Sequence, residues 1–368
     1  MKFSCEKSDI MSEIAIAQEI ISSKNSLSIL SNVFLEAEEN TLTIKATDLK
    51  IYFETKINVE TKIPGQITVF CDRFFNILRS LPESEILFEL REDNYLYITP
   101  AFKKINFKLR TISSDKYPSF QKTPSDNYFS FSQADMVDMI SKTVFAVSND
   151  ETRYYMNGPY FERVDNKLVM VATDGRRLSL VSKTLPVENI DISGVIIPVK
   201  VLNLVKKLSS GEGDLRLAVT DKSIFFELEG KNISSGLIEG QFPNYQRVIP
   251  TDHKYKVIID RGTLNDALKR VSVFAEQKSR KILLSFSENT LSISSEDVEV
   301  GEAREELECK YNGDNITLAV NYLYLLEPLR EIDTEEVSIE FTEENKAITI
   351  KPVPENEYLN IVMPMQIN

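Results

Sequence analysis

Histidine and cysteine are scarce in this sequence of 368 residues. The single histidine, His253, lies in a polar stretch after Pro250, which predicts a solvated linker residue rather than a catalytic base. The three cysteines, Cys5, Cys71 and Cys309, are far apart and form no CxxC pair. A disulfide framework, a zinc site and a histidine-dependent hydrolase are therefore disfavoured, and neither a metal nor a cofactor is expected.

Long apolar runs are also missing. No stretch approaches the ~18 consecutive apolar residues of a membrane-spanning helix. Charged residues occur within the first seven positions with no apolar segment behind them, so no secretory signal is expected and a cytoplasmic location is predicted. Apolar residues make up 42% and charged residues 27% of the chain, as in folded globular proteins. Its length predicts about two to four domains.

The sequence has no glycine-rich phosphate loop. Its nearest candidate, Gly211 with Gly213, lacks both the third glycine and the following helix that would hold a phosphate. The 56 acidic residues leave a glycosidase-type carboxylate pair open without locating it. Against 43 basic residues they give a net charge of −13, which by itself disfavours nucleic-acid binding because such a chain repels phosphates at long range.

An internal repeat is present instead. The segment NTLTIKATD at 40–48 matches NKLVMVATD at 166–174 and, more loosely, NTLSISSED at 289–297. Repeats at a fixed spacing determine the architecture, so they take priority over local patterns. Because each unit contains many strands, three similar globular domains in a row are favoured over a solenoid.

Each repeat unit is predicted to be rich in strands and to contain two helices. In the first unit, Ile10, Ile14, Ala17 and Ile21 follow the 3.6-residue period of an amphipathic helix. Polar segments containing proline at 121–127 and 250–253 are typical of linkers. We therefore expect α+β domains at 1–124, 125–251 and 252–368, with helices predicted at 9–24, 73–81, 132–147, 199–210, 261–281 and 321–331.

Two local features allow more than one interpretation. The Asp174-Gly175 pair follows a strand and favours a tight hairpin turn, although the same turn could present Arg176 and Arg177 to a partner. The C-terminal segment 361–368 is apolar and contains two methionines, which are common on surfaces that accept several partners. It could equally be an edge strand of the last domain.

The chain resembles the bacterial DNA polymerase III beta subunit, the sliding clamp, over nearly its whole length. The segments that carry the resemblance, in the family's order and spacing, are MKF at 1–3, ATDL at 46–49, RYYMNG at 153–158, VATDG at 171–175, GQFPNYQRVIP at 240–250 and VMPM at 362–365.

The resemblance implies a clamp fold and a head-to-tail homodimer that closes a ring of six similar domains around duplex DNA. Such a clamp is not an enzyme. It tethers the polymerase and so confers processivity, and its partners would be the DNA polymerase III catalytic subunit, the clamp loader and other proteins with a clamp-binding motif. A closed ring needs no net attraction to DNA, and the predicted helices, which would line the hole, are more basic than the rest of the chain.

The resemblance also implies functional residues. The partner-peptide pocket would contain Met156, Thr173, Gly175, Arg177, Leu178, Pro243, Arg247, Val248, Asn321, Tyr324, Ile361, Met363, Pro364 and Met365. DNA contacts would come from Lys24, Arg153, Tyr154, Tyr155 and Lys200. The dimer interface would pair Phe107 and Leu109, on an edge strand of the first domain, with Val273 and Phe274 of the third.

Three positions depart from the family pattern. Ser279 stands where some clamps have a pocket aromatic, Arg176 where a histidine is common, and Gln366 where a basic residue is common, so an altered peptide preference is expected. Two alternatives remain at this stage. One is a sheet-rich enzyme that acts on a polymer such as a glycan, and the other is a monomeric repeat scaffold that binds only protein.

Overall fold

The computed structural model describes residues 1–21, 29–102, 104–120, 128–185, 192–297 and 299–367. The chain folds into two compact units, one of residues 1–133 and 207–236 and the other of residues 134–206 and 237–368. The domain boundaries expected at 124/125 and 251/252 stay a prediction. None of the helices in the described ranges has the length and apolar character needed to cross a membrane.

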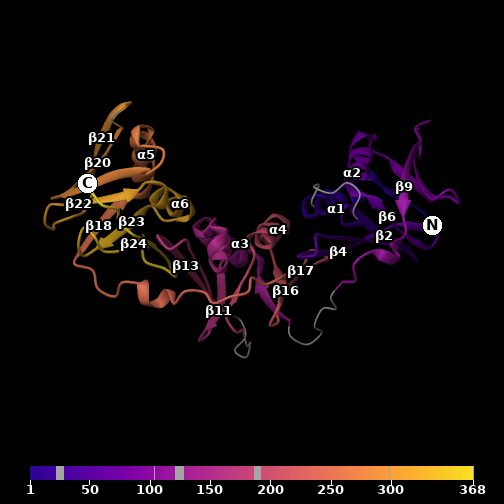
Figure 1. Ribbon diagram of the computed structural model, residues 1–368, viewed down its shortest axis with the longest axis horizontal. Helices are drawn as coiled ribbons and strands as arrows, with labels where there is room; N and C mark the ends of the chain where they lie inside the picture. The colour runs from indigo at the N-terminus through magenta and orange to yellow at the C-terminus, as the bar shows by residue number, and fades with distance from the viewer. Residues whose placement is uncertain (22–28, 103, 121–127, 186–191, 298, 368) are drawn as a thin grey trace. The chain divides into compact units, whose positions relative to one another are not determined.

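The first unit is built on one antiparallel sheet with the strand order β10-β15-β16-β17-β4-β3-β2-β6-β9-β8-β7-β1-β5 (Figure 1). The pairing of β17 with β4, which aligns Ile233 with Phe53, joins strands of the predicted second domain to strands of the first. The strands are β1 Lys2–Glu6, β2 Asn32–Glu38, β3 Thr41–Thr47, β4 Ile51–Asn58, β5 Glu60–Ile63, β6 Gly65–Phe70, β7 Glu85–Leu90, β8 Tyr95–Pro100, β9 Phe107–Ile112, β10 Phe129–Ser132, β15 Asp214–Val219, β16 Ser223–Leu228 and β17 Lys231–Gly236.

Two helices cover this sheet, α1 (Lys7–Ile20) and α2 (Cys71–Ser80). The predicted apolar face of α1 is confirmed, because Ile10, Ile14 and Ala17 are completely buried. In α2, Phe74 packs edge-on against Phe88 of β7 with ring centroids 6.0 Å apart. Burying such side chains stabilises the fold by about 1.5–3 kcal/mol each, which explains why the apolar period predicted α1.

The second unit contains two antiparallel sheets. One has the order β14-β11-β12-β13-β25-β24-β23-β18, and the other the order β21-β20-β19-β22. The strands are β11 Tyr160–Val164, β12 Lys167–Thr173, β13 Arg177–Thr184, β14 Val195–Ile196, β18 Tyr255–Asp260, β19 Lys281–Ser287, β20 Thr290–Asp297, β21 Gly301–Glu308, β22 Ile316–Asn321, β23 Glu336–Phe341, β24 Ile348–Val353 and β25 Tyr358–Val362.

The remaining α-helices are α3 (Gln133–Thr143), α4 (Val199–Leu208), α5 (Arg261–Val271) and α6 (Leu323–Glu331). The predicted helix at 261–281 is too long, since α5 gives way to a single 3₁₀ turn, η6 (Ser272–Phe274), and strand β19 begins at Lys281. Residues 275–280 must connect these two elements and therefore leave the helix. Further 3₁₀ segments include η3 (Val144–Ala146), η4 (Glu151–Met156) and η5 (Tyr245–Val248).

The internal repeat is confirmed in the fold. Its three copies form β3, β12 and β20, and each is the second strand of an antiparallel hairpin. The turn before each strand contains a non-glycine residue with positive φ, namely Glu39 (50°), Asp165 (55°) and Asn289 (54°). Similar sequence thus produces the same hairpin in all three repeats.

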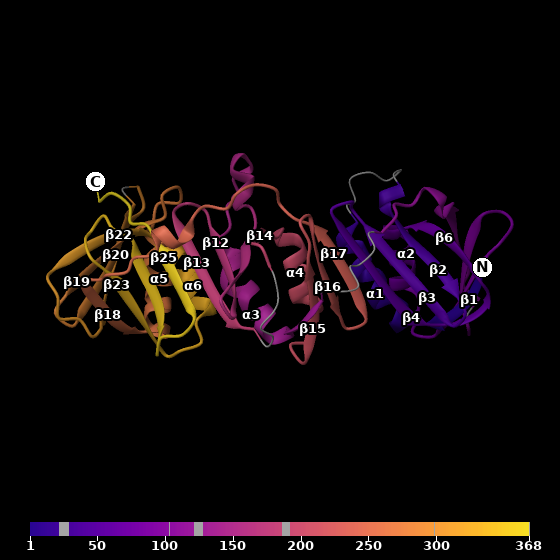
Figure 2. The same cartoon turned by 90° about the horizontal axis from the view of Figure 1, so that it is seen from below.

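Of the two interpretations of the C-terminal segment, the edge strand does not hold for β25. β25 lies between β13 and β24 and is not an edge strand. Figure 2 shows it beside β13. Its pairing with β13 aligns Leu178 with Ile361 and joins a strand of the second repeat to one of the third. The β13–β25 pairing is called the seam. Beyond the strand, the Met365 amide donates to the Ala319 carbonyl at 2.7 Å.

The structure also corrects the solvated position predicted for His253. Its side chain is only 14% exposed, and its Nε2 lies 3.6 Å from a carboxylate oxygen of Glu340, itself 5% exposed. Lys256 and Lys351 pair with the same carboxylate at 2.8 and 3.2 Å. The misprediction arose because the polar segment leads directly into β18, which brings His253 against β23.

Acidification is expected to destabilise this cluster. Burial lowers the pKa of His253 below its ordinary value of 6.5. Burial alone would raise the pKa of Glu340, but hydrogen bonds from Lys256 and Lys351 hold it below its ordinary value. Both groups therefore bind protons more readily in the unfolded chain, so the stability they contribute at neutral pH is lost as the pH falls.

The measurement is the melting temperature between about pH 7.5 and 5, for the wild type and for His253→Gln. We expect the wild type to lose stability as the pH passes below the unfolded histidine pKa, and the variant to lose less over that window. A wild-type curve parallel to that of the variant would show that His253 does not contribute.

Candidate functional site

A buried apolar cluster lies under one end of the seam. It includes Leu178 of β13, Ile361 of β25 and Tyr245 of η5, all less than 9% exposed. The Tyr245 hydroxyl donates to a carboxylate oxygen of Glu162 at 2.6 Å, which satisfies its polar end. The segment carrying η5 is thereby held against the second and third repeats. The predicted pocket regions around Leu178, Tyr245 and Ile361 meet in this cluster.

The turn between β12 and β13 lies at the same end of the seam. Thr173 Oγ1 accepts from the Gly175 amide at 3.0 Å, and Asp174 Oδ1 accepts from the amides of Arg176 and Arg177 at 2.8 and 3.1 Å. Gly175 has φ +87°, and a Cβ added there would lie 2.9 Å from Arg153 Nη1. Glycine is favoured because of this backbone conformation, whereas the flexible end of Arg153 could move away from a Cβ. The predicted hairpin turn is confirmed.

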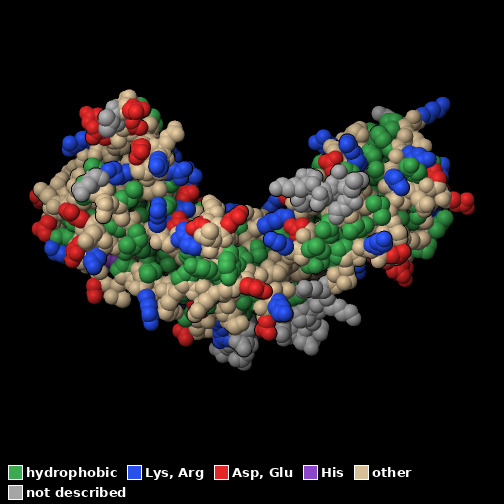
Figure 3. All heavy atoms as spheres, viewed as in Figure 1, with side chains coloured by type: hydrophobic (Ala, Val, Ile, Leu, Met, Phe, Trp, Pro, Cys, Tyr) green, Lys and Arg blue, Asp and Glu red, His purple; other side chains and the backbone are tan. Residues whose placement is uncertain are grey.

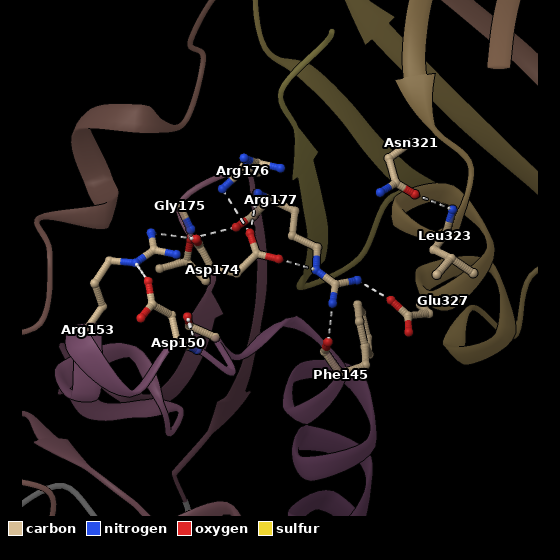
Figure 4. A network of polar contacts seen from close by, with 12 residues as sticks. Phe145, Asp150, Arg153, Asp174, Gly175, Arg176, Arg177, Asn321, Leu323 and Glu327 are labelled. Carbon is tan, nitrogen blue, oxygen red and sulfur yellow. Dashed lines mark hydrogen bonds and ion pairs between the residues drawn. The ribbon is translucent and has the colours of Figure 1, made fainter. Parts of the chain in front are cut away.

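Arg177 is held inside the protein by side chains from several elements (Figure 4). Only 12% of its side chain is exposed. The guanidinium donates to Asp174 at 3.1 Å, to the Phe145 carbonyl at 2.5 Å and to the Glu327 carboxylate. It also lies over the Tyr324 ring, 4.7 Å from the centroid. Of the two arginines that the turn could present to a partner, only Arg176 is exposed.

The start of α6 forms the next part of this surface. Asn321, the last residue of β22, accepts through Oδ1 from the Leu323 amide at 3.0 Å and so fixes the beginning of the helix. This places Tyr324 on the first turn of α6, where its ring stacks on Arg177. Burial is the main reason that the pKa of Tyr324 lies above its ordinary value.

Exposed apolar side chains complete the surface. Met363 is 43% exposed and Val248 is 53% exposed, whereas Pro364 and Met365 are half-buried. The Met363 amide donates to the Arg176 carbonyl at 2.8 Å, which ties the chain end to the β12–β13 turn. We call this surface the seam site. It comprises Thr173, Gly175, Arg177, Leu178, Val248, Asn321, Tyr324, Ile361, Met363, Pro364 and Met365. The other residues predicted for the pocket are the buried Met156 and the exposed Pro243 and Arg247, and they lie in the same unit.

The residues predicted to contact DNA differ in their exposure and in their contacts. Arg153 pairs with Asp150 at 2.9 Å and donates to the Asp174 carbonyl at 3.0 Å, so it supports the β12–β13 turn. Tyr154 is 53% exposed, and Tyr155 packs against the cluster under the seam. Lys200 is exposed near the start of α4. Lys24 lies outside the described residues.

The residues predicted to close a dimer lie on two separate segments. Phe107 and Leu109 are half-buried on β9, whose first half pairs only with β8 among the described strands. The edge-strand prediction therefore holds for that half alone. In η6, Val273 is 74% exposed. Phe274 lies close to Gly301 at the start of β21, the outer strand of its sheet.

Sequence reasoning missed Glu327 and Phe145, which anchor Arg177. Glu327 is separated from Arg177 by 150 positions, and Phe145 contributes its backbone carbonyl together with a ring whose centroid lies 5.6 Å from the guanidinium carbon. No local pattern marks either residue. A charge on the otherwise apolar face of α6 was the only available signal.

Comparison with known proteins decides the family. Three models of the DNA polymerase III beta subunit match in chain order, the N-terminal domain at residues 1–121, the central domain at 130–244 and the C-terminal domain at 246–366. The chain belongs to the DNA polymerase III beta subunit family.

Relatives in this family match along their entire length. The beta sliding clamp of Treponema pallidum is 42% identical over 370 residues and covers both chains completely. Crystal structures of sliding clamps from Pseudomonas aeruginosa and Bartonella birtlesii, each bound to griselimycin, superpose with a TM-score of 0.94 at 29% identity and full coverage of both chains. The chain therefore has the three-domain clamp fold and is a DNA sliding clamp that tethers its polymerase for processivity.

Proposed function

We propose that the seam site binds a short extended peptide carried by the proteins that use this clamp. The observation that carries the proposal is the exposed Met363 side chain at the end of the seam, where its amide is hydrogen-bonded to the β12–β13 turn, together with the exposed Val248, which follows the buried Tyr245. Peptide sites typically combine apolar walls with a few fixed polar groups. The partners are the DNA polymerase III catalytic subunit, the clamp loader and other proteins with a clamp-binding motif.

Charge around the seam site favours peptides with acidic residues. Arg176 and Arg247 are both exposed beside its apolar side chains. Because a carboxylate can accept two parallel hydrogen bonds from a guanidinium, either arginine could fix an acidic position of the peptide. Arg176, which stands where a histidine is common, would shift the peptide preference in this direction.

We further propose that two chains close a head-to-tail ring by joining the first domain (1–124) of each to the third (252–368) of the other. β9 with its basic Lys108 and Arg110 would lie beside β21, which carries Glu302, Glu306 and Glu308. Acidic side chains gather around the end of β20 and β21 (Figure 3). Opposite charges on two exposed edges favour pairing of these strands and oppose the pairing of like edges.

The ring would hold DNA by topology. Tyr154 and Lys200, supported by Lys24, Arg153 and Tyr155, would contact the backbone weakly and allow sliding, while the net charge of −13 opposes tight binding. Tethering makes polymerase rebinding intramolecular, with an effective concentration on the order of millimolar. The clamp would act in the cytoplasm without catalysing a reaction, and this role is favoured over a glycan-acting enzyme or a monomeric scaffold.

Retention on circular DNA tests this function. Clamp loaded by its loader onto nicked circular DNA should stay bound at about 0.2 M salt, because escape requires the ring to open. Cutting the circle once should release it. Without a loader, binding to a short linear duplex should be weak and should fall strongly between about 0.05 and 0.2 M salt. Submicromolar binding to the linear duplex at the higher salt would contradict the ring.

A further inference from the structure

Glu327 lies behind the seam site, where it pairs with a residue that supports the site. It is on α6, one turn after Tyr324, and its carboxylate accepts from Arg177 Nη1. We propose that Glu327 is a positioning residue for peptide binding, holding Arg177 against the Tyr324 ring and thereby fixing the distance between β13 and α6. This inference rests on the proposed peptide-binding role of the seam site.

The three anchors of Arg177 have different consequences. Asp174 and Phe145 belong to the same repeat as Arg177, so their hydrogen bonds orient the guanidinium but do not connect it to the third repeat. Glu327 is the anchor that connects it to α6. Arg177 therefore contacts α6 at two successive turns, through the stacked Tyr324 ring and through the ion pair with Glu327. Both contacts fix the position of Tyr324 at the seam site.

An open pocket on the far side of Glu327 leaves its carboxylate with little packing apart from the ion pair. The pocket has a volume of about 270 Å³, and both Phe145 and Glu327 line it. Its other walls come from α3, α4 and the last turn of α6. Because this space adjoins Glu327, packing on that side does not hold its carboxylate in place, and the pairing with Arg177 does.

The opposite end of the seam provides a matched control. Glu357 accepts from Lys167 at 2.7 Å and from Ser182 at 2.8 Å, so it also joins the second and third repeats through a carboxylate. It lies beside Tyr358, which aligns with Val181, whereas the seam site lies where Arg177 aligns with Val362. A loss confined to Glu327 would therefore separate positioning from general stabilisation.

The experiment measures binding of a fluorescent peptide from the polymerase III catalytic subunit of the same organism. Glu327→Gln should weaken binding about five- to tenfold, because one of several anchors of Arg177 is lost. Glu357→Gln should leave the affinity within about twofold of wild type. In an Arg177→Lys background, Glu327→Gln should add little, since the two residues act as a unit.

The outcomes separate the two proposals. If wild type binds the peptide and Glu327→Gln binds equally well, the positioning role is overturned while the peptide site stands. If wild type does not bind, the proposed function fails. Melting temperature and dimer mass are measured for each variant. Should Glu327→Gln not fold, Glu327→Asp provides the test, since its shorter carboxylate should weaken binding about two- to threefold if Arg177 is displaced.

Discussion

Replacing Phe274 with arginine should convert the proposed dimeric ring into a folded monomer. Phe274 is half-buried at the exposed end of η6, next to Val273. Loss of an apolar anchor commonly costs about 2 kcal/mol or more, and burying an unpaired charge costs more. Because a ring contains two equivalent interfaces, the combined loss of about 4 kcal/mol corresponds to about a thousandfold weaker dimer.

Sedimentation equilibrium measures this change, with melting temperature as the test of folding. Since Phe274 also packs against Gly301 within its own chain, Val273→Arg serves as a second variant, and its 74% exposed side chain leaves the fold intact. Val248→Arg, another substitution of an exposed valine, is the matched control and should stay dimeric. An unchanged dimer in both η6 variants would remove this segment from the interface.

Removing residues 363–368 should abolish most peptide binding while the dimer survives. The truncation deletes Met363 and Met365 from the seam site, and burial of each such side chain is worth roughly 1.5–3 kcal/mol. Peptide affinity should therefore fall about a hundredfold or more. Because β25 ends at Val362 and lies inside its sheet, the truncation leaves that strand complete.

The truncation also removes two backbone hydrogen bonds, from Met363 to Arg176 and from Met365 to Ala319. A modest fall in melting temperature is therefore expected along with the loss of binding. Met363→Ala keeps both bonds and should weaken binding about tenfold at unchanged stability, because this side chain is already 43% exposed in the free protein. Calorimetric titration of the polymerase peptide against all three proteins is the measurement. Equal affinities would refute the assignment of the chain end to the peptide site.

Much of the fold follows from short-range patterns in the sequence. The helical spacing of Ile10, Ile14 and Ala17 predicted α1, and their burial confirms it. The repeated segments predicted β3, β12 and β20. These elements could be predicted because they depend on residues close together in the chain. The same is true of the turn at Gly175, whose conformation only glycine adopts easily. Most seam-site residues came from family motifs, and the fold brings them together.

What the sequence could not supply depends on residues far apart in the chain. The final strand looked like a possible edge but lies between β13 and β24, because sheet order is set by tertiary pairing that periodicity does not encode. The polar sequence around His253 predicted a solvated side chain, but the pairing of β18 with β23 brings it against Glu340. The sequence by itself determined the repeats, most of the helices and the family. Only the tertiary structure brought Glu327 to Arg177 across 150 positions, since no local pattern relates two residues so far apart.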